Sequence, residues 1–146
     1  MANIGKWNTP VLTTVLSTGL NSLGNNTMSA ASSTVSSNLD VYVDIEVVLA
    51  SLSPGGSARV DIYILEAVDG SNFPAQSDAD LRLTATQLLI SIPVGQTAST
   101  AQRVVARNIV LPAGSFQIKL DNQTGVSLAA SSNTVKFNTY DVNLNG

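Results

Sequence analysis

The 146-residue sequence contains no cysteine and no histidine. These absences exclude disulfides, thiol nucleophiles, Ser-His-Asp triads, and thiolate or imidazole metal sites. Charged residues are also scarce, at 12% of the chain, with a formal net charge of −3. The few lysines and arginines are scattered, so the sequence does not predict the dense basic face that binds nucleic acid or an anionic membrane. Together, these absences favour a protein that binds or assembles over one that catalyses.

Long apolar runs are missing as well. No window approaches the roughly 20 apolar residues of a membrane-spanning helix. The first residues, MANIGKWNTPVLTT, have neither the charged start nor the apolar centre of a signal peptide. The glycine clusters lack the Gly-Lys-Ser/Thr ending of a phosphate-binding loop. We therefore expect no cofactor and no membrane association, and we expect synthesis in a reducing cytoplasm.

The strongest positive signal is a pair of long β patterns. Residues 39–50 read LDVYVDIEVVLA, and residues 58–67 read ARVDIYILEA, with SLSPGGS between them. In both stretches apolar and polar residues alternate with a period of two, which predicts half-buried β-strands and argues against an amphipathic helix. We predict two antiparallel neighbours joined by a Pro-Gly-Gly hairpin connection, with both apolar faces on the same core.

Shorter alternating stretches continue to the end of the chain, and no segment predicts a convincing helix. The predicted strands cover residues 81–93, 101–111, 116–121 and 135–139, with turns at 69–72, 95–100, 112–114 and 122–125. About eight or nine short strands at this spacing indicate one all-β domain. The sequence predicts a single antiparallel β-sandwich of jelly-roll or Greek-key type.

The N-terminal segment differs from the rest in composition. We divide the chain into an N-terminal arm with one or two edge strands, residues 1–38, and a β-sandwich body, residues 39–146. Residues 11–17 predict an edge strand, whereas residues 27–37 are small and polar. The segment is either a weak strand or two followed by a loose loop, or an arm that orders against a neighbouring subunit. We expect this segment or a partner to cover the sheet edges.

Carboxylates on the strands suggest one possible catalytic arrangement. Asp40, Asp44 and Glu46 share a strand face, and Asp61 lies across from them in the predicted hairpin. A β-sandwich glycosidase needs two carboxylates about 5–10 Å apart in a cleft. A face exposed to water is the simpler interpretation, so we assign no catalytic residues.

Two further groups are candidates for binding. The loop residues Asp69, Asn72, Asp78 and Asp80 offer oxygens for Ca²⁺ but lack EF-hand spacing. Such residues commonly make turns, so we assign no metal ligands. Tyr42 and Tyr63 fall on the polar faces of the two long strands. They form either a cross-strand pair or a platform for a sugar or a partner.

A set of short motifs occurs in a fixed order along most of the chain. The motifs are Leu20–Leu23, Leu39–Tyr42, Val60–Tyr63, Asp69–Phe73, Leu111–Phe116, Asp121–Gly125 and Leu128–Ser131. In this order the sequence resembles small virion proteins of tailed bacteriophages, the head decoration or cement proteins. The resemblance implies a β-sandwich on the virion surface with no enzymatic role.

The resemblance leads to specific expectations about function. It implies a homo-oligomeric protein, made in the host cytoplasm, that binds the major capsid protein on the outer head surface and stabilises the capsid. The alternative is a tail-associated or surface-displayed glycan-binding module. The candidate interface residues are Trp7, Val11, Leu12, Leu20, Leu23, Tyr42 and Tyr63.

Overall fold

The computed structural model describes residues 11–37, 40–74 and 87–141. Within these ranges the chain forms nine β-strands and one short 3₁₀ helix, η1. The elements are β1 (Thr13–Leu16), η1 (Thr18–Leu20), β2 (Thr27–Met28), β3 (Val35–Ser36), β4 (Tyr42–Leu52), β5 (Arg59–Glu66), β6 (Leu88–Pro93), β7 (Thr100–Val110), β8 (Ser115–Gln123) and β9 (Thr134–Tyr140). The predicted all-β class is confirmed.

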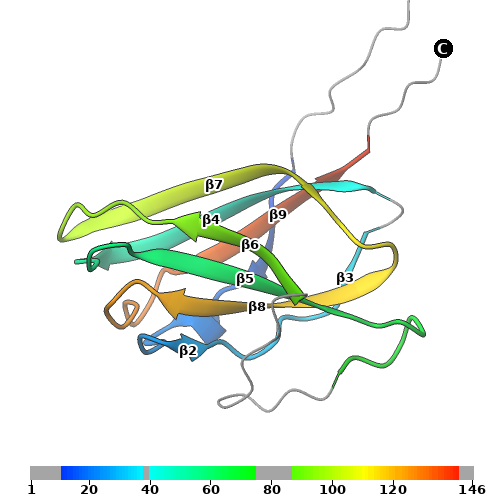
Figure 1. Cartoon of the computed structure of the whole chain (residues 1–146), viewed down its shortest axis with the longest axis horizontal. Helices are drawn as coiled ribbons and strands as arrows, with labels where there is room; N and C mark the ends of the chain where they lie inside the picture. The colour runs from blue at the N-terminus through cyan, green and yellow to red at the C-terminus, as the bar shows by residue number, and fades with distance from the viewer. Residues whose placement is uncertain (1–10, 38–39, 75–86, 142–146) are drawn as a thin grey trace, which may run out of the picture.

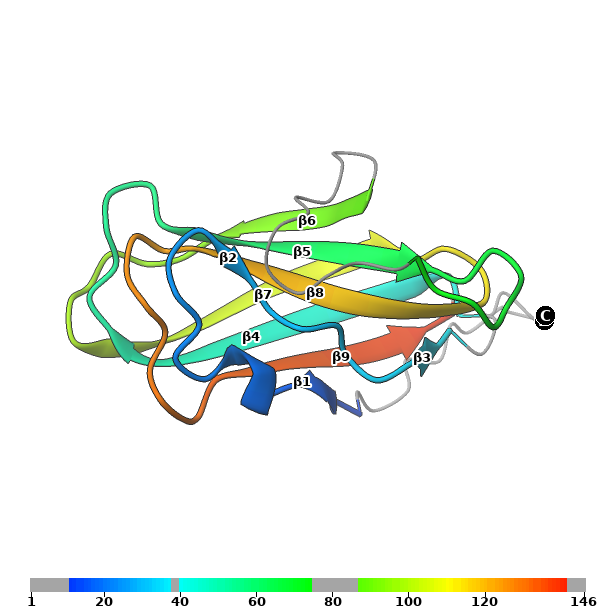
Figure 2. The same cartoon turned by 90° about the horizontal axis from the view of Figure 1, so that it is seen from below.

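The strands form two antiparallel sheets that pack face to face (Figures 1 and 2). Sheet A has the order β1-β9-β4-β7. Sheet B has the order β2-β8-β5-β6, and β3 also pairs with β8. The two layers are clearest in the edge-on view of Figure 2. The fold is therefore an antiparallel β-sandwich, and the jelly-roll or Greek-key assignment stays a prediction.

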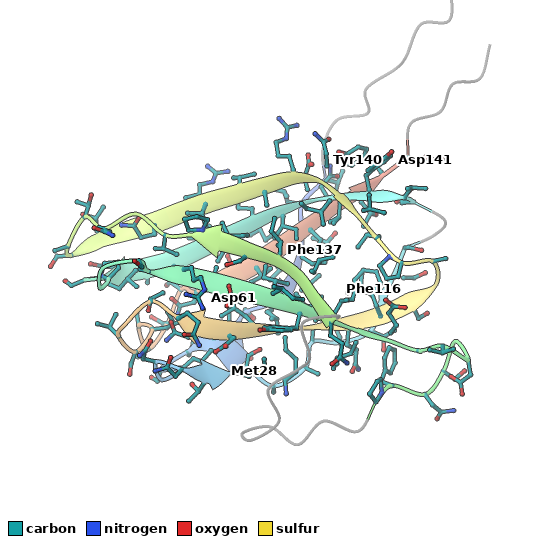
Figure 3. The ribbon with its side chains drawn as sticks, viewed as in Figure 1. Met28, Asp61, Phe116, Phe137, Tyr140 and Asp141 are labelled. Atoms are coloured by element: carbon teal, nitrogen blue, oxygen red, sulfur yellow. The ribbon has the colours of Figure 1, made fainter. Side chains whose placement is uncertain are left out.

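The core lies between the sheets and follows from the alternation in each strand. On β4, Val43, Ile45 and Val47 are fully buried, because every second side chain of a strand points to the same face. Phe116 of β8 and Phe137 of β9 join the two sheets across the core, with ring centroids 6.3 Å apart (Figure 3). The strand faces that the sequence predicted to be apolar are therefore the faces buried in the core.

The predicted hairpin between the two long strands is wrong. β4 pairs with β7 and β9, whereas β5 pairs with β6 and β8, so the segment between them crosses from one sheet to the other. Gly55 donates its N–H to the carbonyl of Thr124 over 2.8 Å. Gly125 follows with φ of +87°, and a Cβ there would lie 3.2 Å from the Gly55 backbone. The Pro-Gly-Gly segment is therefore a corner packed against a second turn.

Part of the N-terminal segment completes both sheets of its own chain. β1 pairs with β9 at the end of sheet A, which confirms the edge strand predicted for residues 11–17. β2 and β3 pair with β8, so sheet edges are covered by this segment as expected. The proposed boundary between arm and body falls at residues 38 and 39, outside the described residues.

Serines extend the pairing between β2 and β3, where the sequence favoured a loose loop. Ser29 donates its N–H to the carbonyl of Leu120 and accepts the N–H of the same residue on its Oγ. Ser32 makes the same pair of bonds with Ile118. Both serines are buried. Because the hydroxyl takes the place of a backbone carbonyl, this Ser-rich stretch stays bonded to β8, and the loose-loop interpretation is wrong.

The turn after β5 depends on the Asp69 carboxylate. Its Oδ1 accepts the backbone N–H groups of Ser71 and Asn72 over 2.9 and 2.7 Å, which confirms the predicted turn chemistry. Hydrogen bonds, chiefly from the Asn72 backbone and side chain, lower the pKa of Asp69 from 3.8 to about 2. Since these bonds favour the charged form, their stabilisation is complete above pH 4 and is lost as the pH falls through about 2.

Replacing Asp69 tests this turn. We expect Asp69→Ala to lower the unfolding midpoint in urea at pH 6 and to differ less from the wild type near pH 2. Neutral Asp69→Asn, which keeps the turn-forming oxygen, is the control. Denaturation measured at both pH values checks the expectation. A difference that stays constant across this range would contradict it.

Candidate functional site

The central strands of sheet B and the edge strand of sheet A differ in exposure. On sheet B, the outward side chains of β5 and β8 are largely buried, because Asp61 is 5%, Leu65 1% and Lys119 1% exposed. On sheet A, Val105 and Val110 of β7 are 53% and 62% exposed. Exposed apolar side chains on a sheet face are available for a partner. The outer face of sheet A is therefore the candidate functional site.

An apolar and aromatic row crosses one end of this face. Tyr42 of β4 lies directly between Val110 of β7 and Tyr140 of β9 in the strand register. The two tyrosine rings stack with centroids 5.8 Å apart and an interplanar angle of 25°. Figure 3 places Tyr140 at the end of β9. The row presents preformed aromatic and aliphatic surface, which costs little side-chain entropy on binding.

Ion pairs occupy the middle of the same face. Glu46, only 5% exposed, accepts hydrogen bonds from Nε and Nη2 of Arg103, and Lys136 Nζ lies 3.7 Å from its Oε1. The side chain of Arg103 is 69% exposed. The solvated-face interpretation is therefore wrong for Glu46. The carboxylate lies beneath the cations, so the cations form the solvent-facing part of this cluster.

A β-bulge in β7 builds the second charged cluster. The register between β4 and β7 shifts between Val43 and Ile45, so Arg107 and Asn108 together oppose Asp44. Asn108 has φ of +58°, and its N–H donates to Asp44 Oδ1 over 2.9 Å. Arg107 Nε donates to the other Asp44 oxygen over 3.2 Å. Bulges often reposition side chains near functional sites, and this one fixes Arg107 on the outer face.

Tyr140 links the aromatic row to this cluster. Its hydroxyl donates to Asn108 Oδ1 and lies 3.3 Å from Asp44 Oδ1. Burial, followed by the negative charge of Asp44, raises the pKa of Tyr140 above 10.0. The neutral phenol is favoured in the folded state, so this contribution to stability is present below pH 10 and is lost as the pH rises through the raised pKa. The row is thus anchored by a hydroxyl that stays protonated at physiological pH.

Removing Arg103, which covers the buried Glu46, is expected to lower the stability of the fold. We expect Arg103→Ala to lower the unfolding free energy by about 1–2 kcal/mol, because the buried Glu46 carboxylate loses two charge-assisted bonds. The loss is no larger because the Arg103 side chain is 69% exposed and solvent screens the pair. Val105→Ala, on the same strand, is expected to cost less than about 0.5 kcal/mol. Urea denaturation of both variants checks this difference. Equal costs would show that the pair contributes nothing measurable.

The structure separates Asp61 from the strand carboxylates that the sequence placed opposite it. Asp61 lies in sheet B, where it bonds Arg59 Nε and Ser91 Oγ, whereas Asp44 and Glu46 lie in sheet A. Asp61 is also buried, so the solvated-face interpretation is wrong for it too. Asp61 therefore does not share a face with Asp44 and Glu46, and each of the three carboxylates is held by basic or hydroxyl neighbours.

Tyr42 and Tyr63 lie in different sheets, and the loop acids proposed as Ca²⁺ ligands do not form a described cluster. Tyr63 opposes Lys119 and Leu88 in sheet B, so the predicted cross-strand pair with Tyr42 is wrong. Both oxygens of Asp69 are engaged in its own turn. Asp78 and Asp80 lie outside the described residues. Within the described ranges, no three acidic, histidine or cysteine side chains come together as a metal-binding group.

The predicted interface residues have different environments. Val11 and Leu12 are 72% and 41% exposed, next to the β1 edge of sheet A. Leu20 is fully buried in the chain's own core, whereas Leu23 is half-buried and packs against that core. The alternation signal is absent around η1, which is why their burial was not predicted. Trp7 lies outside the described residues.

Sequence reasoning missed the β7 and β9 side chains of the site. These residues are Arg103, Val105, Arg107, Val110, Lys136 and Tyr140. The alternation of residues 101–111 was a usable signal for which side chains share a face. It did not say which strand neighbours β4, so it could not place Val110 beside Tyr42.

Comparisons with known proteins give no relatives. No protein-family model matches the chain, and neither a curated protein nor a solved structure matches it. In the described part of the chain, none of the helical structure has the length and apolar character needed to cross a membrane. Functional inference therefore rests on the site itself.

Proposed function

We propose that this protein is a non-enzymatic virion structural protein that binds the outer surface of a phage capsid and stabilises it. The observation that carries the binding role is the exposed outer face of sheet A. There Val105 and Val110 project beside Arg103, whose partner Glu46 is buried, and Arg107, whose partner Asp44 is half-buried. The phage context comes from the ordered motifs in the sequence.

The shape of the site supports docking over chemistry. Its ionisable side chains are held in ion pairs or hydrogen bonds on a sheet face. Preformed aromatic, aliphatic and arginine side chains are the groups that dominate protein interfaces. A rigid two-sheet body holds them at fixed spacing, as a protein that reinforces a shell requires.

Charge on this face complements an acidic partner. Arg103, Arg107 and Lys136 lie there with Asp44 and Glu46, which gives +1 for these five residues, although the whole chain carries −3. Complementary charge steers association and fixes orientation. We therefore propose that the major capsid protein presents an acidic surface to sheet A, and that several copies bind with the symmetry of the shell.

Cosedimentation with expanded, undecorated heads of the parent phage tests the function. We expect saturable binding at a fixed ratio to the capsid subunit, and slower disruption of decorated heads on heating. A folded protein that does not bind heads would overturn the proposal. A glycan array, with and without Ca²⁺, would then test a sugar site at the stacked pair of Tyr42 and Tyr140.

A further inference from the structure

β7 is the last strand of sheet A, so the side of β7 that faces away from β4 is an edge of the sheet. Its eleven residues are all exposed or half-buried. In the described chain, the short strands β1, β2 and β3 lie on the opposite side of the sandwich, beside β9 and β8. β7 lies next to β6, the last strand of sheet B, on the other side of the sandwich (Figure 1). A long edge strand is a template for a further strand.

The side chains along β7 indicate which strand would fit. Val105, 53% exposed, lies between Arg103 and Arg107, whose side chains are 69% and 68% exposed. A guanidinium has five N–H donors. Among the described residues, Arg107 donates to Asp44 through Nε. An added strand with an apolar residue opposite Val105 and a carboxylate on either side would match all three side chains.

A second copy of the chain matches this edge poorly. In an antiparallel β7–β7 pairing centred on Val105, the exposed valines would face each other, but Arg103 would lie opposite Arg107 of the other copy. Directly opposed like charges are destabilising. The terminal segments of the chain are equally unsuitable, because residues 1–10 and 142–146 contain no Asp or Glu. Charge therefore favours a different protein over β7 of a second copy and over these two segments.

The bulge sets the length of the docking edge. β4 and β7 keep an unbroken register from Ile45↔Ala106 to Leu49↔Gln102. Beyond Ala106, Arg107 and Asn108 interrupt the ladder and increase the local twist. A regular added strand is thus limited to the edge formed by residues 102–106, with Arg107 at its limit.

We propose that the open edge of β7 binds an extended acidic segment of a partner protein, added as an antiparallel strand. This inference rests on the proposed docking role of sheet A and specifies what docks there. The segment carries acidic residues two positions before and two positions after an apolar residue. Backbone hydrogen bonds supply affinity in such strand addition, and alternate side chains supply specificity.

A synthetic peptide tests the proposal without any phage component. The probe is acetyl-Asp-Thr-Val-Thr-Asp-Ser-amide, which spans the edge from Arg107 to Gln102 when its valine lies opposite Val105. The matched control peptide has lysine in place of both aspartates. We expect titration of the full-length protein, followed by NMR, to show saturable shifts of the β7 amides. The lysine peptide should bind at least about tenfold more weakly, because two favourable charge pairs become repulsive.

Matched protein variants locate the binding. Val105→Glu and Arg103→Gln should each weaken the acidic peptide by about tenfold, whereas Val68→Glu should leave binding unchanged. Val68, on the turn after β5, is 97% exposed, so its variant controls for added negative charge. Val105→Glu replaces a side chain that is 53% exposed, so it removes no buried group. It therefore still tests the edge if the Arg103→Gln protein does not fold. Thermal melts of each variant establish folding.

Each result has a definite meaning. No binding of the acidic peptide, equal binding of the lysine peptide, or an unchanged affinity in Val105→Glu would overturn the proposal. A concentration-dependent dimer that Val105→Glu abolishes would also overturn it, because a second copy would then occupy the edge. Peptide binding without head binding would support the edge site while rejecting the capsid role. Head binding that is unaffected by Val105→Glu would support the capsid role while rejecting the edge of β7 as the contact.

Discussion

Asn122→Ala is expected to lower the unfolding free energy by about 3–4 kcal/mol and the melting temperature by about 10 °C. Asn122 is fully buried at the end of β8. Its Nδ2 donates to the carbonyls of Leu23, Gly24 and Val126, and its Oδ1 accepts from the N–H and Oγ1 of Thr124. Truncation removes the two N–H donors that these three carbonyls share and the oxygen that accepts from Thr124, so buried carbonyls are left with fewer donors.

The reason for this large effect is that Asn122 joins three segments. It ties the N-terminal segment to β8 and closes the turn that follows β8. Asn72→Ala is the matched control, because Asn72 is exposed and bonds within its own turn. Calorimetry or urea denaturation of both variants measures the difference. A loss below about 1 kcal/mol for Asn122→Ala would show that the N-terminal segment is stabilised elsewhere.

Val110→Asp is expected to weaken binding to undecorated heads by about 30-fold or more, with little change in folding. Val110 is 62% exposed and adjoins Tyr42 in the aromatic row. An aspartate there must be desolvated at the interface and adds negative charge next to Asp44. Loss of about 2 kcal/mol of binding free energy at a desolvated interface position corresponds to this change.

Val68→Asp makes the same chemical change far from the site. Val68 is 97% exposed on the turn after β5. We expect this variant to bind heads like the wild type. Cosedimentation at several protein concentrations gives both affinities, and thermal melts confirm that both variants fold. Equal weakening by the two substitutions would indicate a general effect of negative charge.

The sequence predicted the class of the fold because burial leaves a period-two pattern. The apolar residues of β4 and β5 alternate, and they point into one core as expected. The same pattern arises whether two strands are neighbours in one sheet or face each other across a sandwich. For this reason the alternation could not show that residues 53–58 cross between sheets. That distinction depends on contacts with β7, β8 and β9, which lie far along the chain.

The N-terminal segment shows a second limit. Serines at residues 29 and 32 carry no hydrophobic signal, yet both are buried and bonded to β8. Their role depends on where the neighbouring backbone lies, which composition does not reveal. The candidate site was likewise only partly predicted. Tyr42 was singled out, whereas Val110 and Tyr140 become its neighbours only through strand pairing.

The most direct test of the docking face uses the absence of cysteine in the chain. Single thiols introduced by Val110→Cys and Val68→Cys can be modified with a maleimide in free protein and in protein bound to heads. The account predicts that heads slow modification at position 110 strongly and leave position 68 unchanged. Slowed modification at position 68, with position 110 still reactive, would place the capsid contact on another surface and contradict the assignment of sheet A.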